Sequence, residues 1–381
     1  MAVTNWRGKA PWPALPFQRL MAYKPRPCPP KGRREPHTMT PIPAVLHQHL
    51  GQAPVLLVAP HTVAPLLPAS SLVRDDPQTQ AEFAAHVAEW HDVGSAEMLT
   101  AAAAALDATA LCNALPRGLL DLNRGWRGRV EAKETLFGKG AVDGTVAPWL
   151  IPQARETLQQ CHRQAHDAVR RAAQGLRGLV ELHSYGELGS TYDRLNGGRP
   201  VRRPKTAIVD ATPWASAFPV GLAKLVPGDL RGAPWPLCNA VAGALSAADL
   251  SPGPHPYPTQ GPWTLSMRFV ADRWFQWLGD IGQLPKATAA RLSDLAWTDE
   301  QHPDLDAALV GEFAEDLAGL PELAQVTLAW SGDASDLGAR FLRETGTFGT
   351  TVEIRLDLAP RADAAGRAVA AGLQQFLATG T

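Results

Sequence analysis

Short apolar runs alternate with helix-like stretches along most of this chain, and this alternation restricts its fold more than any other feature. Strands are expected at 55–58, 118–122, 178–183, 207–209, 326–330 and 350–358. Helices are expected at about 77–89, 95–106, 152–175, 235–248, 285–296, 304–318 and 361–377. The pattern predicts an α/β fold in which helices cover both faces of a mostly parallel or mixed central sheet.

The first 38 residues have a different composition. Segment 25–34 reads Pro-Arg-Pro-Cys-Pro-Pro-Lys-Gly-Arg-Arg, which is basic, rich in proline and unable to build a hydrophobic core. We expect residues 1–38 to form a poorly ordered tail and residues 39–381 to form a single domain. Met39 is an alternative start to Met1.

Composition excludes several classes of partner. The 36 basic and 37 acidic residues nearly cancel, so no nucleic acid or anionic membrane surface is expected as a partner. No apolar run approaches the roughly 20 residues that span a bilayer, and the amino-terminal segment lacks the apolar core of a signal peptide. The four cysteines lie far apart without CxxC spacing, which favours reduced thiols in a cytoplasmic protein.

Two histidines end predicted strands. His61 follows Val-Leu-Leu-Val-Ala-Pro, and His183 ends Gly-Leu-Val-Glu-Leu. Ligands bind at the carboxyl ends of strands in open sheets of this kind, and neutral imidazole is the commonest protein metal ligand. A lone histidine of this type is more often a core or capping residue, but two on neighbouring strands could share one metal ion.

A catalytic zinc site usually needs a third protein ligand. The carboxypeptidase spacing His-x-x-Glu is absent, because Ala64 stands three positions after His61. The best substitute is Asp92 in Trp-His-Asp-Val-Gly, with His91 as its rival. Asp75 and Asp76 are weaker candidates because Arg-Asp-Asp-Pro has the form of a helix start.

A basic and amide-bearing segment follows, Leu-Pro-Arg117-Gly-Leu-Leu-Asp121-Leu-Asn123-Arg124. Arginine presents a fork of donors that fits a carboxylate, and asparagine adds neutral donors. Arg117, Asn123 and Arg124 are therefore candidates to bind the carboxylate of a small substrate. The alternative is a structural salt-bridge cluster around Asp121.

These pieces occur in one order over about residues 53–190: Ala-Pro-His61, His-Asp92-Val-Gly, Pro-Arg117, Asp121-Leu-Asn123-Arg124 and Glu-Leu-His183-Ser. In that order they resemble N-formylglutamate amidohydrolases, and Asp-Leu-Asn-Arg is also similar to aspartoacylases and succinylglutamate desuccinylases of the wider zinc-carboxypeptidase group. The resemblance implies a zinc-carboxypeptidase-like fold, also described as phosphorylase/hydrolase-like. It further implies one divalent metal ion, zinc, and a hydrolase-type catalytic domain over 39–381.

The resemblance also implies a glutamate on a late strand, and Thr350-Thr-Val-Glu353-Ile-Arg-Leu fits. Strand alternation puts Glu353 on the face opposite Val352 and Ile354. By resemblance Glu353 is the base that takes a proton from metal-bound water. The alternative is a surface strand with its polar residues turned to solvent.

Two further positions have weaker signals. His162 and His166 are four residues apart on one helix face, a spacing that can bind zinc, but Arg163 stands where a metalloprotease has glutamate. By resemblance His166 is assigned to substrate binding instead. Tyr257, in Tyr-Pro-Thr-Gln-Gly, resembles part of a substrate loop.

The combined prediction is a hydrolase that cleaves the amide bond of an N-acyl amino acid, including N-formyl, or of a short peptide with a free carboxylate. Glu353 would act as base, and Arg117 would orient the substrate and stabilise the oxyanion. A zinc carboxypeptidase is one alternative. A binding protein that keeps the fold without catalysis is another, favoured by the missing glutamate at position 64.

Overall fold

The computed structural model describes residues 45–62, 69–126, 140–189, 201–209, 230, 232–254, 264–297 and 334–379. All of them belong to one compact unit, Ile42–Thr381. The predicted tail, the strand at 326–330 and the helix at 304–318 lie outside the described residues, so these predictions remain untested.

The centre of the fold is a mixed sheet. Its strands are β1 (Val45–His49), β2 (Val55–Ala59), β3 (Thr109–Asn113), β4 (Gly178–Tyr185), β5 (Thr206–Val209), β6 (Pro252–Gly253) and β7 (Phe348–Arg355). Their order is β1-β3-β2-β4-β7-β5-β6. The four central strands β3, β2, β4 and β7 are parallel, whereas β1 and β5 pair antiparallel to their inner neighbours.

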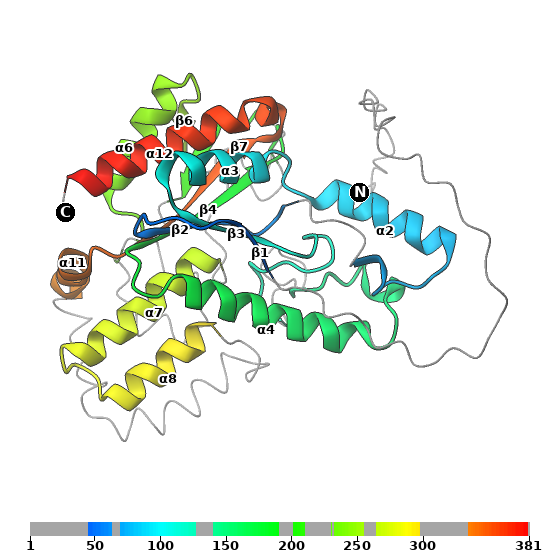
Figure 1. The fold of residues 1–381 in the computed structure, drawn as a ribbon, viewed down its shortest axis with the longest axis horizontal. Coiled ribbons are helices and arrows are strands. Elements are labelled where there is room, and N and C mark those ends of the chain that lie inside the picture. The colour runs from blue at the N-terminus through cyan, green and yellow to red at the C-terminus, as the bar shows by residue number, and fades with distance from the viewer. Residues whose placement is uncertain are drawn as a thin grey trace, which may run out of the picture. The chain divides into compact units, whose positions relative to one another are not determined.

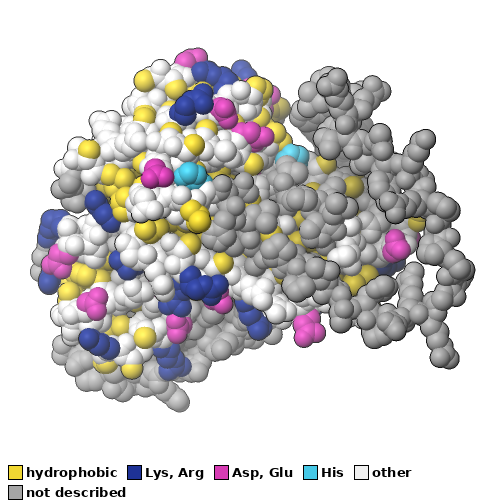
Figure 2. Space-filling view, in the orientation of Figure 1, with side chains coloured by type: hydrophobic (Ala, Val, Ile, Leu, Met, Phe, Trp, Pro, Cys, Tyr) yellow, Lys and Arg dark blue, Asp and Glu magenta, His cyan; other side chains and the backbone are white. Residues whose placement is uncertain are grey.

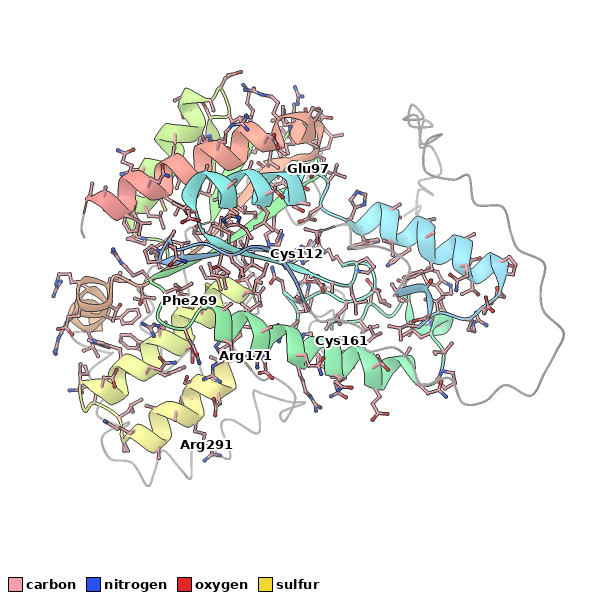
Figure 3. All side chains as sticks on the ribbon, in the orientation of Figure 1. Glu97, Cys112, Cys161, Arg171, Phe269 and Arg291 are labelled. Atoms are coloured by element: carbon pink, nitrogen blue, oxygen red, sulfur yellow. The ribbon has the colours of Figure 1, made fainter. Side chains whose placement is uncertain are left out.

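Helices cover both faces of this sheet, as predicted (Figure 1). One face carries α3 (Ser95–Leu106), α6 (Trp235–Ala247) and α12 (Ala362–Ala378). The other carries α4 (Ala154–Ala172), α7 (Leu265–Asp280) and α8 (Lys286–Trp297). The other helical segments in the described residues are α2 (Pro77–Trp90), η4 (Ala147–Trp149), α11 (Ala334–Thr345) and η7 (Leu356–Arg361). Figure 3 marks α3 by Glu97, above the sheet, and α7 by Phe269, below it.

Local sequence chemistry explains several boundaries. The Asp76 side chain accepts the Thr79 N–H at 2.8 Å, and Pro77 occupies the first turn, so α2 starts where the sequence predicted. Glycines let α12 approach its neighbours closely. A Cβ at Gly366 would lie 2.3 Å from the Met98 carbonyl oxygen of α3, and one at Gly372 would lie 2.5 Å from Cα of Val241 in α6.

The predicted strand at 118–122 is wrong, because this segment is a turn in which Leu119 and Leu120 donate to the Pro116 carbonyl. The segment has an apolar run because its leucines pack into the core beside α2, not because they form a strand. Helix α7 was missed for a related reason. Burial around most of its circumference removes the polar stripe on which a periodicity argument depends. Strands β1 and β3 and helix α11 were also missed.

Within the described ranges, no helix combines the length and hydropathy needed to cross a bilayer. Basic and acidic side chains are interspersed over the face in Figure 2, in keeping with the nearly balanced charge of the chain. Cys112, Cys161 and Cys238 are buried.

Candidate metal centre and its surroundings

Three neighbouring parallel strands bring the candidate residues to one edge of the sheet. His61 follows β2, and His183 lies near the end of β4, which pairs with β2. Strand β7 lies on the other side of β4, with Glu353 in register with His183. The predicted placement of His61 and His183 at strand ends, and of Glu353 on a late strand, is confirmed.

Asp92 reaches the histidines through the short link between α2 and α3. Its backbone N–H donates to the His61 carbonyl at 3.0 Å, and the Ser95 hydroxyl donates to the Asp92 carbonyl at 2.7 Å. Gly94, with φ of 86°, makes the turn between them in the left-handed region that favours glycine. The link is thereby attached to the backbone of His61, and the Asp92 carboxylate is buried between the two imidazoles.

Both histidines present the same ring nitrogen to one carboxylate oxygen. Nδ1 of His183 lies 2.9 Å from Oδ2 of Asp92, and Nδ1 of His61 lies 3.4 Å from that oxygen. The rings are edge to face with centroids 4.5 Å apart. One potential ligand atom from each of the three residues lies within 4.8 Å of the others. The structure thus brings together the predicted trio His61, Asp92 and His183, although their role as ligands remains a prediction.

His61 has one buried ring nitrogen, Nδ1, without a hydrogen-bond partner. Nε2 lies 2.8 Å from Oδ1 of Asp121, and because an ionised carboxylate only accepts, Nε2 must donate. In the neutral ring Nδ1 then carries a lone pair, and it is buried without a hydrogen-bond partner. When the ring is neutral this lone pair faces the Asp92 oxygen, so that either a proton or a metal ion between the two atoms would be stabilised.

The residues therefore fit a divalent metal ion. Two imidazole nitrogens and one carboxylate oxygen form a donor set that zinc accepts, and three protein ligands leave a coordination position open. A ligand histidine almost always donates its other N–H to a carboxylate or carbonyl, as His61 does to Asp121.

The electrostatics of the site also favour a cation. Burial opposes ionisation of Asp92, but His61, the hydrogen bond from His183 and Arg117 hold the pKa of its carboxyl well below the usual range. Burial likewise opposes ionisation of Asp121, and His61 and Arg117 nevertheless lower its pKa. Burial would lower the pKa of His183, yet its hydrogen bonds with Asp92 and Glu181 raise it to about 10.

Sequence reasoning missed Glu181, a fully buried carboxylate two residues before His183. Its Oε2 accepts from Nδ2 of Asn123 at 2.7 Å and lies 3.3 Å from Nε2 of His183. A signal was present, because residues two apart on a strand share a face and a glutamate inside an apolar run is costly unless it has polar partners. Asp121 was noticed only as the centre of a salt-bridge cluster, and its contact with His61 was not predicted.

The rival third ligands lie elsewhere. His91 caps the carboxyl end of α2, and Asp76 caps its amino end. Among the described residues, the group that could hold a metal ion contains Asp92 and none of His91, Asp75 or Asp76. The carboxylate nearest the two histidines therefore comes from a different segment than position 64, and its role as a ligand remains a prediction.

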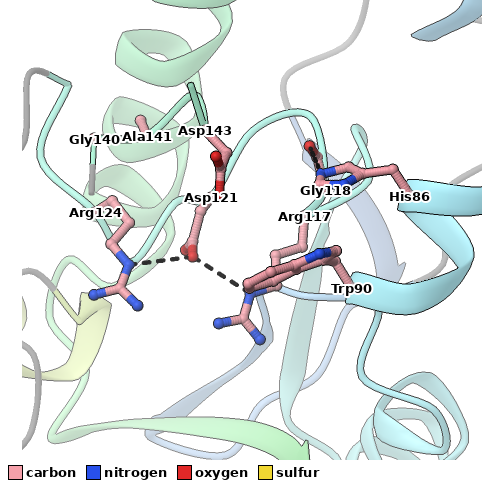
Figure 4. Close-up of a pocket in the computed structure, with 9 residues that line it drawn as sticks. All are labelled: His86, Trp90, Arg117, Gly118, Asp121, Arg124, Gly140, Ala141 and Asp143. Carbon is pink, nitrogen blue, oxygen red and sulfur yellow. Dashed lines mark hydrogen bonds and ion pairs between the residues drawn. The ribbon is translucent and has the colours of Figure 1, made fainter. Parts of the chain in front are cut away.

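Arg117 and Arg124 flank Asp121 beside a small pocket (Figure 4). Nε of each lies 3.4 Å from Oδ2 of Asp121, and Nη1 of Arg117 lies 3.1 Å from Oδ1 of Asp92. The salt-bridge alternative therefore describes part of their role. The pocket has a volume of about 20 Å³, enough for a water molecule, and its other walls include His86 and Trp90.

The other predicted substrate-binding residues have structural partners. The Asn123 amide nitrogen contacts Glu181 and His183, and its oxygen accepts the Leu265 N–H at 3.3 Å. His166 is buried in α4 with Nε2 3.0 Å from the Leu122 carbonyl. Tyr257 lies outside the described residues. A contact of Asn123, His166 or Tyr257 with substrate remains a prediction.

Strand β7 is internal, between β4 and β5. Val352 and Ile354 pack into the core beneath α3, α6 and α12, so Glu353 lies on the opposite face together with His183. Thr351 and Arg355, which share its face, are buried. The alternative of a solvent-facing strand is wrong, while the role of Glu353 as a base is untested.

Comparisons with known proteins give a structural likeness only. No protein-family model and no curated protein matches the chain. N-formylglutamate amidohydrolase from Ralstonia eutropha aligns at 14% identity over 89% of this chain and 100% of that chain, with a TM-score of 0.48. A gene product of Agrobacterium tumefaciens aligns at 15% identity over 88% and 96%, with a TM-score of 0.40. The first is a member of the family that the ordered motifs resemble, but likenesses at this level carry no conclusion about what this chain does.

Proposed function

We propose that this protein is a metal-dependent hydrolase that cleaves the amide bond of an N-acyl amino acid with a free carboxylate. The observation that carries the metal centre is the pair of imidazole Nδ1 atoms aimed at one Asp92 oxygen, with that of His61 buried and without a hydrogen-bond partner. The reaction class comes from the ordered sequence motifs. The name of the Ralstonia eutropha protein, N-formylglutamate amidohydrolase, agrees with that class.

His61, Asp92 and His183 would hold the metal ion, which we take to be zinc. When bound, such an ion polarises the amide carbonyl and lowers the pKa of water toward 7. The Asp121 carboxylate fixes the His61 ring with its Nδ1 toward the centre, because it accepts from Nε2.

Glu353 would act as general base and then as acid. Its position in register with His183, on the same face of the sheet, supports this role. The glutamate takes a proton from the attacking water and later passes it to the leaving nitrogen, so that one carboxylate serves both steps.

Arg117 and Arg124 would bind the substrate carboxylate or the developing oxyanion. Both guanidinium groups lie beside Asp121 next to the centre, and a guanidinium is a charged fork of donors that fits a carboxylate or an oxyanion. Arg117 is the nearer candidate for the oxyanion, because its Nη1 reaches Asp92.

Elemental analysis of the purified full-length protein after zinc loading and dialysis tests the centre. We expect about one zinc per chain, lost in His183→Ala and kept in His49→Ala, since His49 lies on β1 outside the cluster. A zinc-free wild type, or full occupancy in His183→Ala, would refute the assignment.

A substrate panel then tests the reaction. We expect the zinc-loaded protein to hydrolyse N-formyl or N-acetyl amino acids, with release of the free amine. Faster cleavage of carboxy-terminal residues from short peptides would identify a carboxypeptidase instead. Stable zinc and ligand binding without turnover of any member would favour the non-catalytic alternative.

A further inference from the structure

Glu181 connects the metal centre to a helix on the same face of the sheet. While Oε2 contacts Asn123 and His183, Oε1 accepts the backbone N–H of Ser266 at 2.7 Å. Ser266 is the second residue of α7, so one buried carboxylate contacts a candidate ligand and a helix terminus at once.

The amino end of α7 lacks a cap of the usual kind. Its N-cap residue, Thr264, makes no side-chain capping hydrogen bond. The first two helical N–H groups, of Leu265 and Ser266, instead donate to Asn123 and Glu181. A carboxylate at this end also interacts favourably with the helix dipole. Residues of the site therefore perform the work that an N-cap side chain does in most helices.

The contact depends on a close approach between α7 and the sheet. A Cβ at Gly349 of β7 would lie 2.6 Å from the Ser266 carbonyl oxygen, so a larger residue there would push the first turn away. Helix α7 is itself buried along most of its length. A displacement of this turn would therefore be transmitted directly to Glu181.

We propose that Glu181 is a positioning residue that couples the first turn of α7 to His183, so that metal binding and ordering of this turn stabilise each other. This inference rests on the proposed metal centre. The coupling is reciprocal by thermodynamic necessity: if an intact first turn favours the metal, the metal favours the intact turn by the same free energy.

Zinc affinity, measured by competition with a chromogenic chelator, is the first test. Glu181→Gln retains the shape and one oxygen for Ser266, but its amide nitrogen cannot accept from Asn123 or His183. We expect an affinity about 10–100-fold lower, the usual effect of losing an outer partner of a ligand histidine, with the stoichiometry unchanged.

Two matched variants separate this effect from general damage to α7. Ser266→Ala keeps the backbone N–H that Glu181 accepts, and Asp272→Asn alters another buried carboxylate of the same helix, which contacts Arg170 and Ser293. Both should bind zinc as wild type does. If either matches the loss in Glu181→Gln, the coupling does not run through Glu181.

Amide hydrogen exchange in the wild type tests the reverse direction and remains informative if the variant does not fold. Zinc should slow exchange at Leu265 and Ser266 more than in the last turn of α7. Unchanged first-turn exchange on zinc binding overturns the coupling and leaves the metal centre standing, as does wild-type affinity in Glu181→Gln. A wild type that binds no zinc overturns both.

Discussion

The helices on the two faces of the sheet bury different kinds of side chain. On one face, α3, α6 and α12 bury no charged residue and no histidine, and small side chains bring the helices into close contact. On the other, α4 and α7 bury His162, His166, Arg268 and Asp272, and β4 buries Glu181 and His183. Burial on the first face stabilises mainly through apolar area, whereas each polar group on the second requires a partner.

Two histidines buried on the polar face contact the loop beside the candidate site. His166 and His162, one helical turn apart, lie with Nε2 3.0 Å from the carbonyls of Leu122 and Arg124, respectively. These carbonyls belong to the loop that carries Asp121, Asn123 and Arg124. The two buried histidines therefore support the loop beside the candidate centre, whereas Asp272 pairs with Arg170 and Ser293 and stabilises the packing of the helices.

Glu353→Gln should have the largest effect on activity. The amide keeps the shape of the side chain but cannot accept a proton, so we expect kcat to fall about 10²–10⁴-fold. Zinc content and the circular dichroism spectrum should stay as in wild type, because Glu353 is not assigned as a ligand. Steady-state kinetics on the preferred amide would measure this.

The matched control is Glu344→Gln. Glu344 lies in α11, before the amino end of β7, and pairs with Arg340 and Trp277. It should retain full activity. Near-normal turnover in Glu353→Gln would show that another residue is the base, and equal losses in the two variants would indicate a structural effect.

A pair of core truncations tests the difference between the faces. Leu373→Ala in α12 and Leu265→Ala in α7 each remove a fully buried side chain. Each should lower the free energy of unfolding by about 2–5 kcal/mol in urea titrations. Only Leu265→Ala should also weaken zinc binding, because the cavity left by this core side chain would let the first turn of α7 shift away from Asn123 and Glu181.

If Leu373→Ala weakens zinc binding as much as Leu265→Ala, measured under conditions where both are folded, the faces do not differ in their connection to the site. Unchanged zinc affinity in both variants would instead confine the site to the strand-end residues.

Sequence patterns predicted the parts of the fold whose surroundings are simple. The capping pair Asp76-Pro77 and the amphipathic helix α4 follow from local chemistry. His61 and His183 were expected at strand ends because buried strands are continuous apolar runs, and Glu353 was expected on a late strand from the resemblance of the ordered motifs. Helix α7 could not be found in this way. Its burial depends on helices and strands distant in the sequence, which no local window contains.

In the site, too, some residues could be predicted from their own segment and others only from distant contacts. His61 and His183 carry a signal in their own segments, but the position of Asp92 depends on a hydrogen bond from its backbone to that of His61. Glu181 was overlooked although it shares one strand face with His183. Its importance comes from its hydrogen bond with Ser266, which is 85 positions away in the chain. Tertiary contacts, not residue types, decide such roles.

Arg124→Ala should have a smaller effect on activity than Glu353→Gln. Losing a charge-assisted hydrogen bond costs about 1.5–3 kcal/mol, or roughly 10–150-fold in kcat/KM. The loss should be much larger for substrates with a free carboxylate than for their esters. Arg170→Ala is the control, since Arg170 lies on the same face but pairs with Asp272 and Asp294. Equal losses on acid and ester would remove Arg124 from substrate recognition.

The smallest expected effect concerns pH and the buried histidines of the polar face. Burial, the neighbouring His162 and Arg268 hold the pKa of His166 well below its ordinary value of 6.5, although its hydrogen bond to Leu122 acts in the opposite direction. Below pH 6.5 the unfolded chain therefore binds a proton that the folded protein does not. The contribution of His166 to the free energy of unfolding should be fully present above this pH. It should fall as the pH is lowered, by at most about 1.4 kcal/mol per pH unit.

His166→Gln isolates this contribution, because glutamine can still donate to the Leu122 carbonyl but does not titrate. Urea unfolding at several pH values should give a shallower decline in the variant, by about one proton, below pH 6.5. At higher pH both proteins carry a neutral side chain here, so any stability difference should be independent of pH. Parallel curves below pH 6.5 would mean that His166 takes up its proton as readily in the folded protein as in the unfolded chain. The polar face would then accommodate a charged imidazole on α4, and the histidines buried on this face would not need to stay neutral.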